Sequence, residues 1–101
     1  MNISAHDFPA PRATSVNISE DTLSVDLADG RTVSVPLAWY PRLLHSSAKD
    51  RQHWRLIGAG TGIHWPDIEE DVSIEGLILG RPSQEAQSSF SRWLEGRQKK
   101  S

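Results

Sequence analysis

The sequence of 101 residues contains no cysteine. Disulfide bonds, thiolate nucleophiles and cysteine-based zinc sites are therefore excluded. No apolar run approaches the roughly 20 residues that a membrane-spanning helix needs. The N-terminal residues also lack the apolar core flanked by positive charge that marks a secretory signal. We therefore expect a cytoplasmic protein.

Positive charge is scarce over most of the chain. Lysine and arginine total 11 against 13 aspartate and glutamate, a formal net charge of −2. Five of the 11 basic residues lie in the short C-terminal stretch 81–101. A dedicated nucleic-acid-binding protein usually needs a basic face to neutralise phosphates. The composition argues against that class, except at the C-terminal end.

The length indicates one domain, and no internal repeat is present. We expect a flexible lead-in over residues 1–13, which carries Pro9 and Pro11 and would dock, if at all, through Phe8. A single α+β domain is predicted over residues 14–80. A C-terminal helix with a basic tail is predicted over residues 81–101.

Alternating apolar and polar residues predict a β-hairpin near the N-terminus, around the turn residues Asp29-Gly30. A two-residue loop would mix polar and apolar side chains on one face. A three-residue loop with Gly30 in the left-handed region avoids this conflict, because it sets Val25 opposite Val33. The resulting apolar face contains Leu23, Val25, Val33 and Val35.

Short helices and strands are predicted for the middle of the chain. Pro41 suits the first turn of a helical piece over 40–45, and Ser47 with Asp50 forms a weak capping box for another over 48–53. The two pieces could also join as one bent helix, Pro41 to His53. Strands are expected at 54–57 and 63–65, interrupted by three glycines.

The remainder of the chain is expected to be mainly helical. Ser73 is a predicted N-cap for a helix that runs to Leu79 and ends at Gly80. A last helix is expected from Gln84 to Leu94, with Ser83 as its N-cap. The fold class is therefore α+β: a small antiparallel sheet with an N-terminal hairpin, packed against short helices, plus a C-terminal amphipathic helix.

The last helix carries an apolar stripe, because Ala86, Phe90, Trp93 and Leu94 have helical spacing. The stripe either caps the sheet or docks on a partner chain, with arginine and lysine side chains steering the approach. We select as partner-binding candidates the aromatic residues near the middle of the chain and the residues of this stripe with its neighbouring arginine. These are Trp39, Tyr40, Phe90, Trp93, Leu94 and Arg97.

An acidic run, Asp67, Glu69, Glu70 and Asp71, precedes the helix expected from Ser73. Acidic residues before a helix N-terminus complement its macrodipole. The same run is a candidate acidic surface for a basic partner or a cation. A small hydrolase or metal site that joins it to His64 is a lesser hypothesis.

The remaining motifs do not identify a chemical site. None of the four histidines, His6, His45, His53 and His64, has zincin spacing, although a site assembled in space from the last three stays open. The glycine cluster over 58–62 fits neither a P-loop nor a dinucleotide fingerprint. We expect no catalytic, cofactor-binding or metal-binding residues, and no cofactor.

Three segments together resemble a bacterial family known as domain of unknown function 2442. They are Val35-Pro36-Leu37-Ala38-Trp39-Tyr40-Pro41-Arg42-Leu43-Leu44, Trp54-Arg55-Leu56-Ile57-Gly58, and the run from Gly62 to Leu77 that contains Ile63-His64-Trp65-Pro66. The resemblance covers roughly residues 14–80 and implies a compact α+β domain. Its members are often encoded beside another small uncharacterised family, as in toxin–antitoxin pairs. Some members add a helix-turn-helix, for which the single helix expected after Gly80 is too short.

These observations together favour a non-enzymatic protein-interaction module of unknown biological role, of an antitoxin-like kind. Its partner would be a protein encoded nearby or a second copy of the chain. The alternative is a nucleic-acid-binding or transcription-regulating accessory protein that uses the basic tail. No membrane association is expected.

Overall fold

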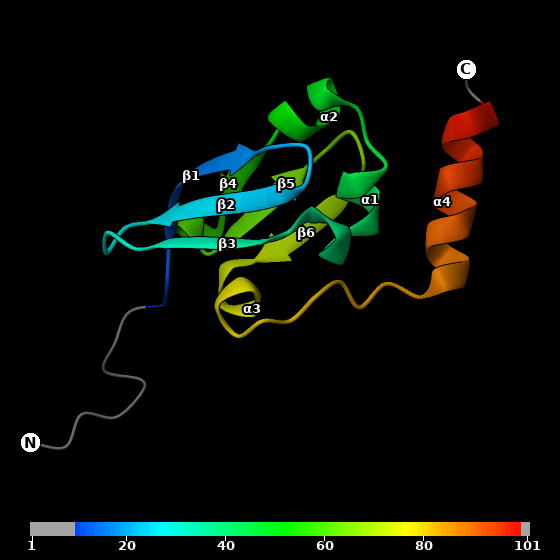
Figure 1. The fold of residues 1–101 in the computed structure, drawn as a ribbon. Helices are drawn as coiled ribbons and strands as arrows, with labels where there is room; N and C mark the ends of the chain where they lie inside the picture. The colour runs from blue at the N-terminus through cyan, green and yellow to red at the C-terminus, as the bar shows by residue number, and fades with distance from the viewer. Residues whose placement is uncertain (1–9, 100–101) are drawn as a thin grey trace, which may run out of the picture.

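The computed structural model describes residues 10–99, and their side chains as far as Arg97. Two three-stranded antiparallel sheets form the body (Figure 1). The first contains β1 (Ala13–Ile18), β2 (Thr22–Leu27) and β3 (Thr32–Pro36), and the second contains β4 (Arg55–Ile57), β5 (Gly62–Trp65) and β6 (Glu70–Ser73). The predicted α+β class is confirmed, with two small sheets in place of one.

Short helices connect and cover the sheets. They are α1 (Pro41–Leu44), α2 (Ala48–Gln52) and α3 (Ile74–Ile78), and the longer α4 (Gln87–Lys99) follows at the C-terminal end. Two single 3-10 turns, η2 (Leu37–Trp39) and η3 (Gly58–Gly60), complete the elements. No helix in the described part of the chain is long and apolar enough to cross a membrane.

The first hairpin has the predicted register. Val25 lies opposite Val33, and Leu23 lies opposite Val35. Gly30 closes the three-residue loop with φ +96°, and the Leu27 amide donates to the Arg31 carbonyl at 2.8 Å. Leu23, Val25 and Val35 are buried and Val33 is half-buried, so the apolar face that the alternation predicts is the one that packs into the core.

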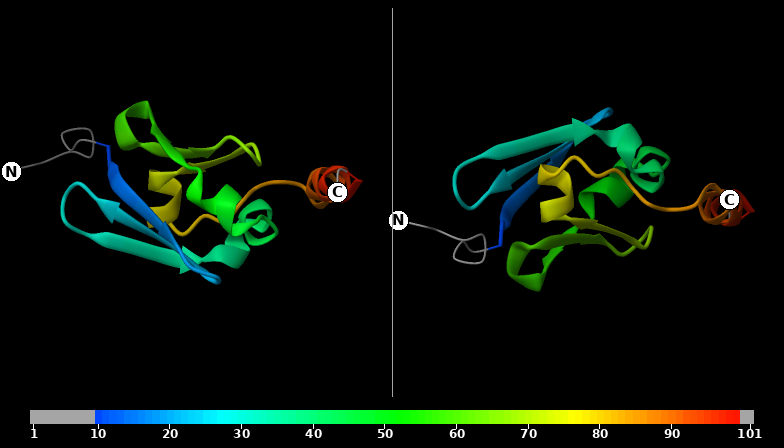
Figure 2. Two further views of the ribbon diagram at one scale, coloured as in Figure 1. Left: turned by 90° about the horizontal axis from the view of Figure 1, so that it is seen from above. Right: turned by 90° about the horizontal axis from the view of Figure 1, so that it is seen from below.

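The core lies between the two sheets. Figure 2 shows the two sheets on opposite sides of the body, and Figure 1 shows α2 above them and α3 below. Both sheets contribute fully buried side chains, as do the helices and turns between them. The largest of these are Trp65, Leu23, Leu37, Leu43, Ile63, Ile68, Ile74 and Val25. Trp65 is thus a core residue, and Trp54 packs half-buried against the same cluster.

The two helical pieces predicted over 40–45 and 48–53 are confirmed as α1 and α2. The alternative of one bent helix is wrong, because Ser47 is extended (φ −78°, ψ 164°) where it caps α2 through its capping box with Asp50. The predicted ends of the last helix are also wrong. α4 begins at Gln87, since the Ser83 hydroxyl accepts from Glu85 in a local turn and residues 81–86 stay outside regular structure. The helix also continues through Lys99, where a polar tail was expected from Gly96.

The strand β6 was not predicted. The acidic run was expected to lie ahead of a helix, but Glu70 and Asp71 belong to a strand whose Trp65↔Glu70 and Ile63↔Val72 pairs join it to β5. Only Val72 is apolar among its four residues. A strand this short shows no alternation of apolar and polar residues that the sequence could reveal. The hydrogen-bonded pairing with β5 is what makes it a strand. The helix predicted after Ser73 is confirmed as α3, and the Ser73 hydroxyl accepts from the Gly76 amide.

β1 begins at Ala13, one residue before the predicted start of the domain, and Ala13 is buried. Phe8 and the rest of residues 1–9 lie outside the described part of the chain. The turn η3 contacts the start of β1. A Cβ added to Gly60 would lie 2.8 Å from the Ala13 carbonyl oxygen.

Two glycine substitutions are expected to change stability in opposite directions. Gly60→Ala combines a left-handed φ of +93° with that backbone overlap, so we expect it to lower the free energy of unfolding by about 1–3 kcal/mol. Gly96→Ala lies in α4 with open space around it and is expected to raise stability by up to about 1 kcal/mol. Urea denaturation of both variants measures this. If both substitutions changed the free energy of unfolding equally, the left-handed conformation of Gly60 and its close approach to Ala13 would be contradicted.

Candidate functional site

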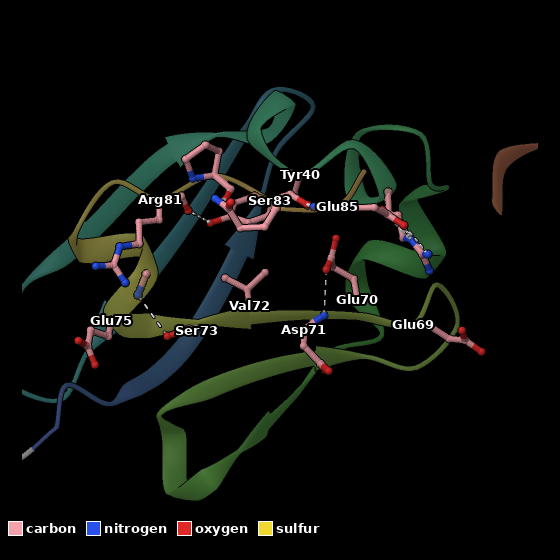
Figure 3. Close-up of a pocket in the computed structure, with 14 residues that line it drawn as sticks. Tyr40, Glu69, Glu70, Asp71, Val72, Ser73, Glu75, Arg81, Ser83 and Glu85 are labelled. Carbon is pink, nitrogen blue, oxygen red and sulfur yellow. Dashed lines mark hydrogen bonds and ion pairs between the residues drawn. The ribbon is translucent and has the colours of Figure 1, made fainter. Parts of the chain in front are cut away.

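The site with the most chemical character is an open groove beside α3, which we call the acidic groove. It encloses about 580 Å³ between β6 with the start of α3 on one side and the extended segment 81–85 on the other (Figure 3). Tyr40 and Val72 lie along it. Its charged side chains are five carboxylates and two arginines: Glu69, Glu70, Asp71, Glu75, Glu85, Arg42 and Arg81. With both arginines counted, the groove carries an excess of acidic groups.

The wall formed by segment 81–85 depends on how α3 ends. Gly80 has φ +73°, its amide donates to Leu77, and the Arg81 amide donates to the Gly76 carbonyl at 2.8 Å. These two bonds form a Schellman motif, which ends the helix and turns the chain. The Ser83 amide then donates to the Trp39 carbonyl at 3.0 Å. The segment is thereby held against the residues that precede α1.

Arg42 joins three parts of the chain at one end of the groove. Its Nε and Nη2 donate to both Glu85 oxygens at 2.6–3.1 Å, and its Nη1 donates to the Ile68 carbonyl at 2.9 Å. Its guanidinium also lies 5.2 Å from the centroid of the Trp93 ring. The hydrogen bonds from Arg42 hold the pKa of the Glu85 carboxyl below its usual range. Glu85 is therefore a fully partnered carboxylate, bound as a fork.

Glu70, in contrast to Glu85, has only one of its two carboxylate oxygens hydrogen-bonded. Its Oε1 accepts from the Asp71 amide at 3.1 Å, whereas its Oε2 is buried and has no hydrogen-bond partner among the described residues. Burial raises the pKa of the Glu70 carboxyl, the Asp71 amide partly opposes this, and the charge of Glu85 adds to the increase. Burial and the charge of Glu70 also raise the pKa of Tyr40 to about 12. Tyr40 is thus a neutral hydroxyl, whose Oη donates to the Arg81 carbonyl at 3.3 Å.

This arrangement predicts a pH-dependent effect of Glu70→Gln. A raised pKa means that the folded state favours the protonated carboxyl. The favourable contribution is complete below the ordinary value of 4.5 and is lost as the pH rises through the raised pKa. At pH 7 the variant, which mimics the protonated form, should therefore be more stable than the natural protein by on the order of 1 kcal/mol.

The advantage of Glu70→Gln should disappear near pH 4, because the natural side chain is then protonated in both the folded and the unfolded state. Urea denaturation at both pH values measures it. Glu20→Gln, on an exposed turn, is the matched control and should stay within about 0.5 kcal/mol of the natural protein. A Glu70→Gln variant that is less stable than the natural protein at pH 7 would show that Oε2 of Glu70 has a hydrogen-bond partner.

The acidic groove gathers only part of the predicted site residues. Tyr40, Glu69, Glu70 and Asp71 line it. Asp67 lies elsewhere and pairs with His53, with 2.6 Å between Oδ2 and Nδ1. Glu85, Arg42 and Arg81 were not selected from the sequence. No sequence signal links Arg42 to Glu85, because 43 positions separate them.

The five residues of the lesser hydrolase or metal hypothesis do not gather at one place. Glu69 and Glu70 line the acidic groove, whereas the other three belong to two separate histidine–aspartate pairs. His64 and Asp71 meet on neighbouring strands of the second sheet, with 2.5 Å between Nδ1 and Oδ1. Asp67 belongs to the separate pair with His53. Within the described part of the chain, no three histidine, aspartate or glutamate side chains gather as a metal site.

The apolar stripe of α4 packs within the chain except for Ala86, which precedes the helix and is exposed. Phe90 is 9% exposed and its ring lies 5.3 Å from that of His45. The guanidinium groups of Arg42 and Arg97 lie 5.2 and 5.0 Å from the centroid of the Trp93 ring. α4 thus lies against the α1 region, at the edge of the body (Figure 1), and does not cap a sheet.

The other partner-binding candidates, on α4 and before α1, are partly buried or form hydrogen bonds within the chain. Leu94 and Trp39 are half-buried, and Trp39 packs against the core. Arg97 donates to Asp50 at 2.5 Å and to the Asp67 carbonyl at 3.3 Å. Its guanidinium is therefore occupied within the chain, which adds no support to nucleic-acid binding through the C-terminal end. A partner-binding role for these residues stays a prediction.

A family model extends over the residues that build the body and most of the acidic groove. Residues 13–83 match the family described as "Protein of unknown function (DUF2442)". The chain belongs to this family. The resemblance predicted from the sequence is thereby confirmed. Of the groove residues, only Gln84 and Glu85 lie beyond the DUF2442 match, and so does α4.

Two solved structures are similar to this DUF2442 chain. A crystal structure of a protein of unknown function from Rhodospirillum rubrum ATCC 11170 has a TM-score of 0.65 and 29% identity, and the alignment covers 76% of this chain and 95% of that one. A solution NMR structure of an uncharacterised protein from Chromobacterium violaceum has a TM-score of 0.62 and 20% identity, covering 80% and 74%. No curated protein matches the chain. The comparisons support the fold and a family of unknown role.

Proposed function

We propose that the chain is a non-enzymatic protein-interaction module whose acidic groove receives a basic side chain of a partner protein. The observation that carries the proposal is the unpartnered Oε2 of Glu70 in a groove with excess negative charge. A buried carboxylate oxygen without a hydrogen-bond donor is costly, and a cationic donor brought by a partner protein would relieve that cost. The groove is open along one side, so a protruding side chain can enter, and a rotation of Glu70 would expose Oε2 to it.

Protein binding fits the chemistry of the groove better than catalysis. The two serines that line it, Ser73 and Ser83, accept hydrogen bonds from nearby backbone amides. Among the described residues, no histidine lines the groove to serve as a base for either serine. Nucleophilic catalysis by serine needs such a base within hydrogen-bond reach. Glu85 is held by Arg42 and Tyr40 stays protonated. We therefore assign no acid–base pair to the groove.

An antitoxin-like role is the biological setting that we favour. It rests on the gene arrangement that is common among members of the family, in which a second small protein is encoded alongside. The partner would then be that second protein, with a lysine or arginine that enters the acidic groove. Self-association is the alternative source of such a side chain.

The proposal is tested by binding of the purified full chain to the product of the adjacent gene. We expect a complex at micromolar concentration that weakens as salt is added, because the contact is between charges. Glu70→Gln should weaken the complex by about tenfold or more, which corresponds to about 1.4 kcal/mol. Glu20→Gln should leave it unchanged.

The expected effects of Glu70→Gln on stability and on binding have opposite signs. A substitution that merely damages the fold would lower both, whereas loss of a binding carboxylate raises stability and lowers affinity. Failure to form any complex, together with failure to rescue growth when the neighbouring protein is expressed, would contradict the proposal. A complex that is insensitive to Glu70→Gln would remove the acidic groove as its site.

A further inference from the structure

The outer edge of the second sheet borders the acidic groove. β6 is the last strand of this sheet, whose order is β4-β5-β6, and all four of its residues line the groove. Among the described residues, no backbone hydrogen bond joins β6 to segment 81–85 across the groove. An edge strand presents amides and carbonyls that can pair with another chain. The groove therefore offers backbone groups as well as carboxylates.

The hydrogen-bond pattern between β5 and β6 determines which backbone groups face the groove. The Ile74 amide donates to the Thr61 carbonyl at 3.0 Å, just beyond the last strand pair. Hydrogen-bonded and non-hydrogen-bonded pairs alternate in an antiparallel ladder, so Asp71 and Ser73 direct their amides away from β5. The Asp71 amide accordingly donates to Oε1 of Glu70 at 3.1 Å. Both Asp71 and Ser73 are exposed.

We propose that the partner enters the acidic groove as an extended segment and adds a fourth strand to the second sheet, with a lysine or arginine opposite Glu70. This inference rests on the proposed function, because it uses the same groove and the same carboxylate. Strand addition at a sheet edge gives affinity through main-chain hydrogen bonds and specificity through alternate side chains. The five carboxylates of the groove against its two arginines favour a basic segment.

Glu70 couples the charge contact to the backbone contact. In the free chain its Oε1 occupies the Asp71 amide, and its Oε2 is buried without a partner among the described residues. When the carboxylate rotates toward an incoming cation, the Asp71 amide becomes available to a carbonyl of the added strand. The Asp71 carbonyl, directed the same way, accepts an amide of that strand. The charge contact and the pair of backbone bonds thus form together.

The pleat of β6 predicts a sequence pattern for the partner. Figure 3 shows the Glu70 and Val72 side chains on the side of Tyr40, with Asp71 directed the other way. Val72 is 4% exposed. Side chains on one face of a strand are two residues apart, so the partner residue opposite Val72 lies two positions from the basic residue and meets an apolar surface. The expected pattern is a basic residue, any residue and an apolar residue, in either direction.

An NMR titration of the full chain with a heptapeptide tests the inference. The probe is Thr-Val-Thr-Lys-Thr-Val-Thr with blocked ends, whose symmetric sequence fits either strand direction. We expect it to slow hydrogen exchange of the Asp71 and Ser73 amides. N-methylation of the two threonines beside the lysine should lower its affinity by about tenfold or more, because their amides face β6. N-methylation of the two valines, whose amides face away from β6, is the matched control and should change the affinity by less than about threefold.

Three outcomes would overturn the inference, and each differs from failure of the proposed function. Equal affinity of the two N-methylated peptides would mean that the groove captures only the lysine side chain, as the proposed function alone requires. Slowed exchange in β3 and not in β6 would place the added strand on the first sheet. No binding of the heptapeptide would exclude strand addition, whereas a complex with the product of the adjacent gene that Glu70→Gln weakens would still support the proposed function.

Discussion

Trp65→Ala is expected to lower the free energy of unfolding by about 3–5 kcal/mol. The Trp65 side chain is fully buried on β5, and its Nε1 donates to the Arg51 carbonyl at 3.1 Å. The substitution therefore removes the largest fully buried side chain and leaves a carbonyl near the end of α2 without its donor. A domain of this size is stabilised by only roughly 5–15 kcal/mol. We expect urea denaturation to show a variant close to the limit of folding.

Trp65→Phe separates the two contributions. It keeps most of the ring volume and removes the indole N–H, so a cost of about 1–2 kcal/mol is expected. Trp54→Ala is a second comparison, since Trp54 is only half-buried against the core, and it should cost less than Trp65→Ala. A Trp65→Ala variant within about 1 kcal/mol of the natural protein would be incompatible with Trp65 in a packed core.

Arg42→Ala is expected to free segment 81–85 and loosen α4. The substitution removes the fork on Glu85, the bond to the Ile68 carbonyl and the cation–π contact with Trp93. The Arg42 and Glu85 side chains are 14% and 15% exposed, so the pair is shielded but not fully desolvated. We expect a loss of about 2–3 kcal/mol, below the range for a fully buried pair. Urea denaturation measures the loss, and hydrogen exchange of the α4 amides reports the loosening.

Two matched variants make this result specific. Arg42→Lys keeps the charge but cannot form the fork, so it should recover only part of the loss. Arg92→Ala removes an exposed arginine from α4 and should change stability by no more than about 0.5 kcal/mol. If exchange of the α4 amides were the same in Arg42→Ala as in the natural protein, the contacts of Phe90, Trp93 and Arg97 would be sufficient to hold α4.

The acidic groove contains Glu70, a residue that costs stability at neutral pH. The proposed partner would compensate for that cost by bringing a cationic group to the groove.

Local patterns were sufficient for the first hairpin and for most helix ends. Val25 and Val33 alternate with polar neighbours, and only a three-residue loop places them on one face, so the register follows from the sequence. Ser47 with Asp50, and Ser73 with Gly80, cap their helices within a few residues. Capping depends on side chains next to the helix end and needs no distant contact.

Long-range contacts decided the remainder. β6 has one apolar residue in four and exists because β5 pairs with it. Arg42 and Glu85 meet only because the end of α3 turns segment 81–85 back toward α1. The acidic run was recognised from the sequence, but which of its members would be buried and lack a partner was not. The sequence alone thus determined the elements whose stabilising contacts are local, whereas the acidic groove, whose walls are far apart along the chain, was decided by tertiary packing.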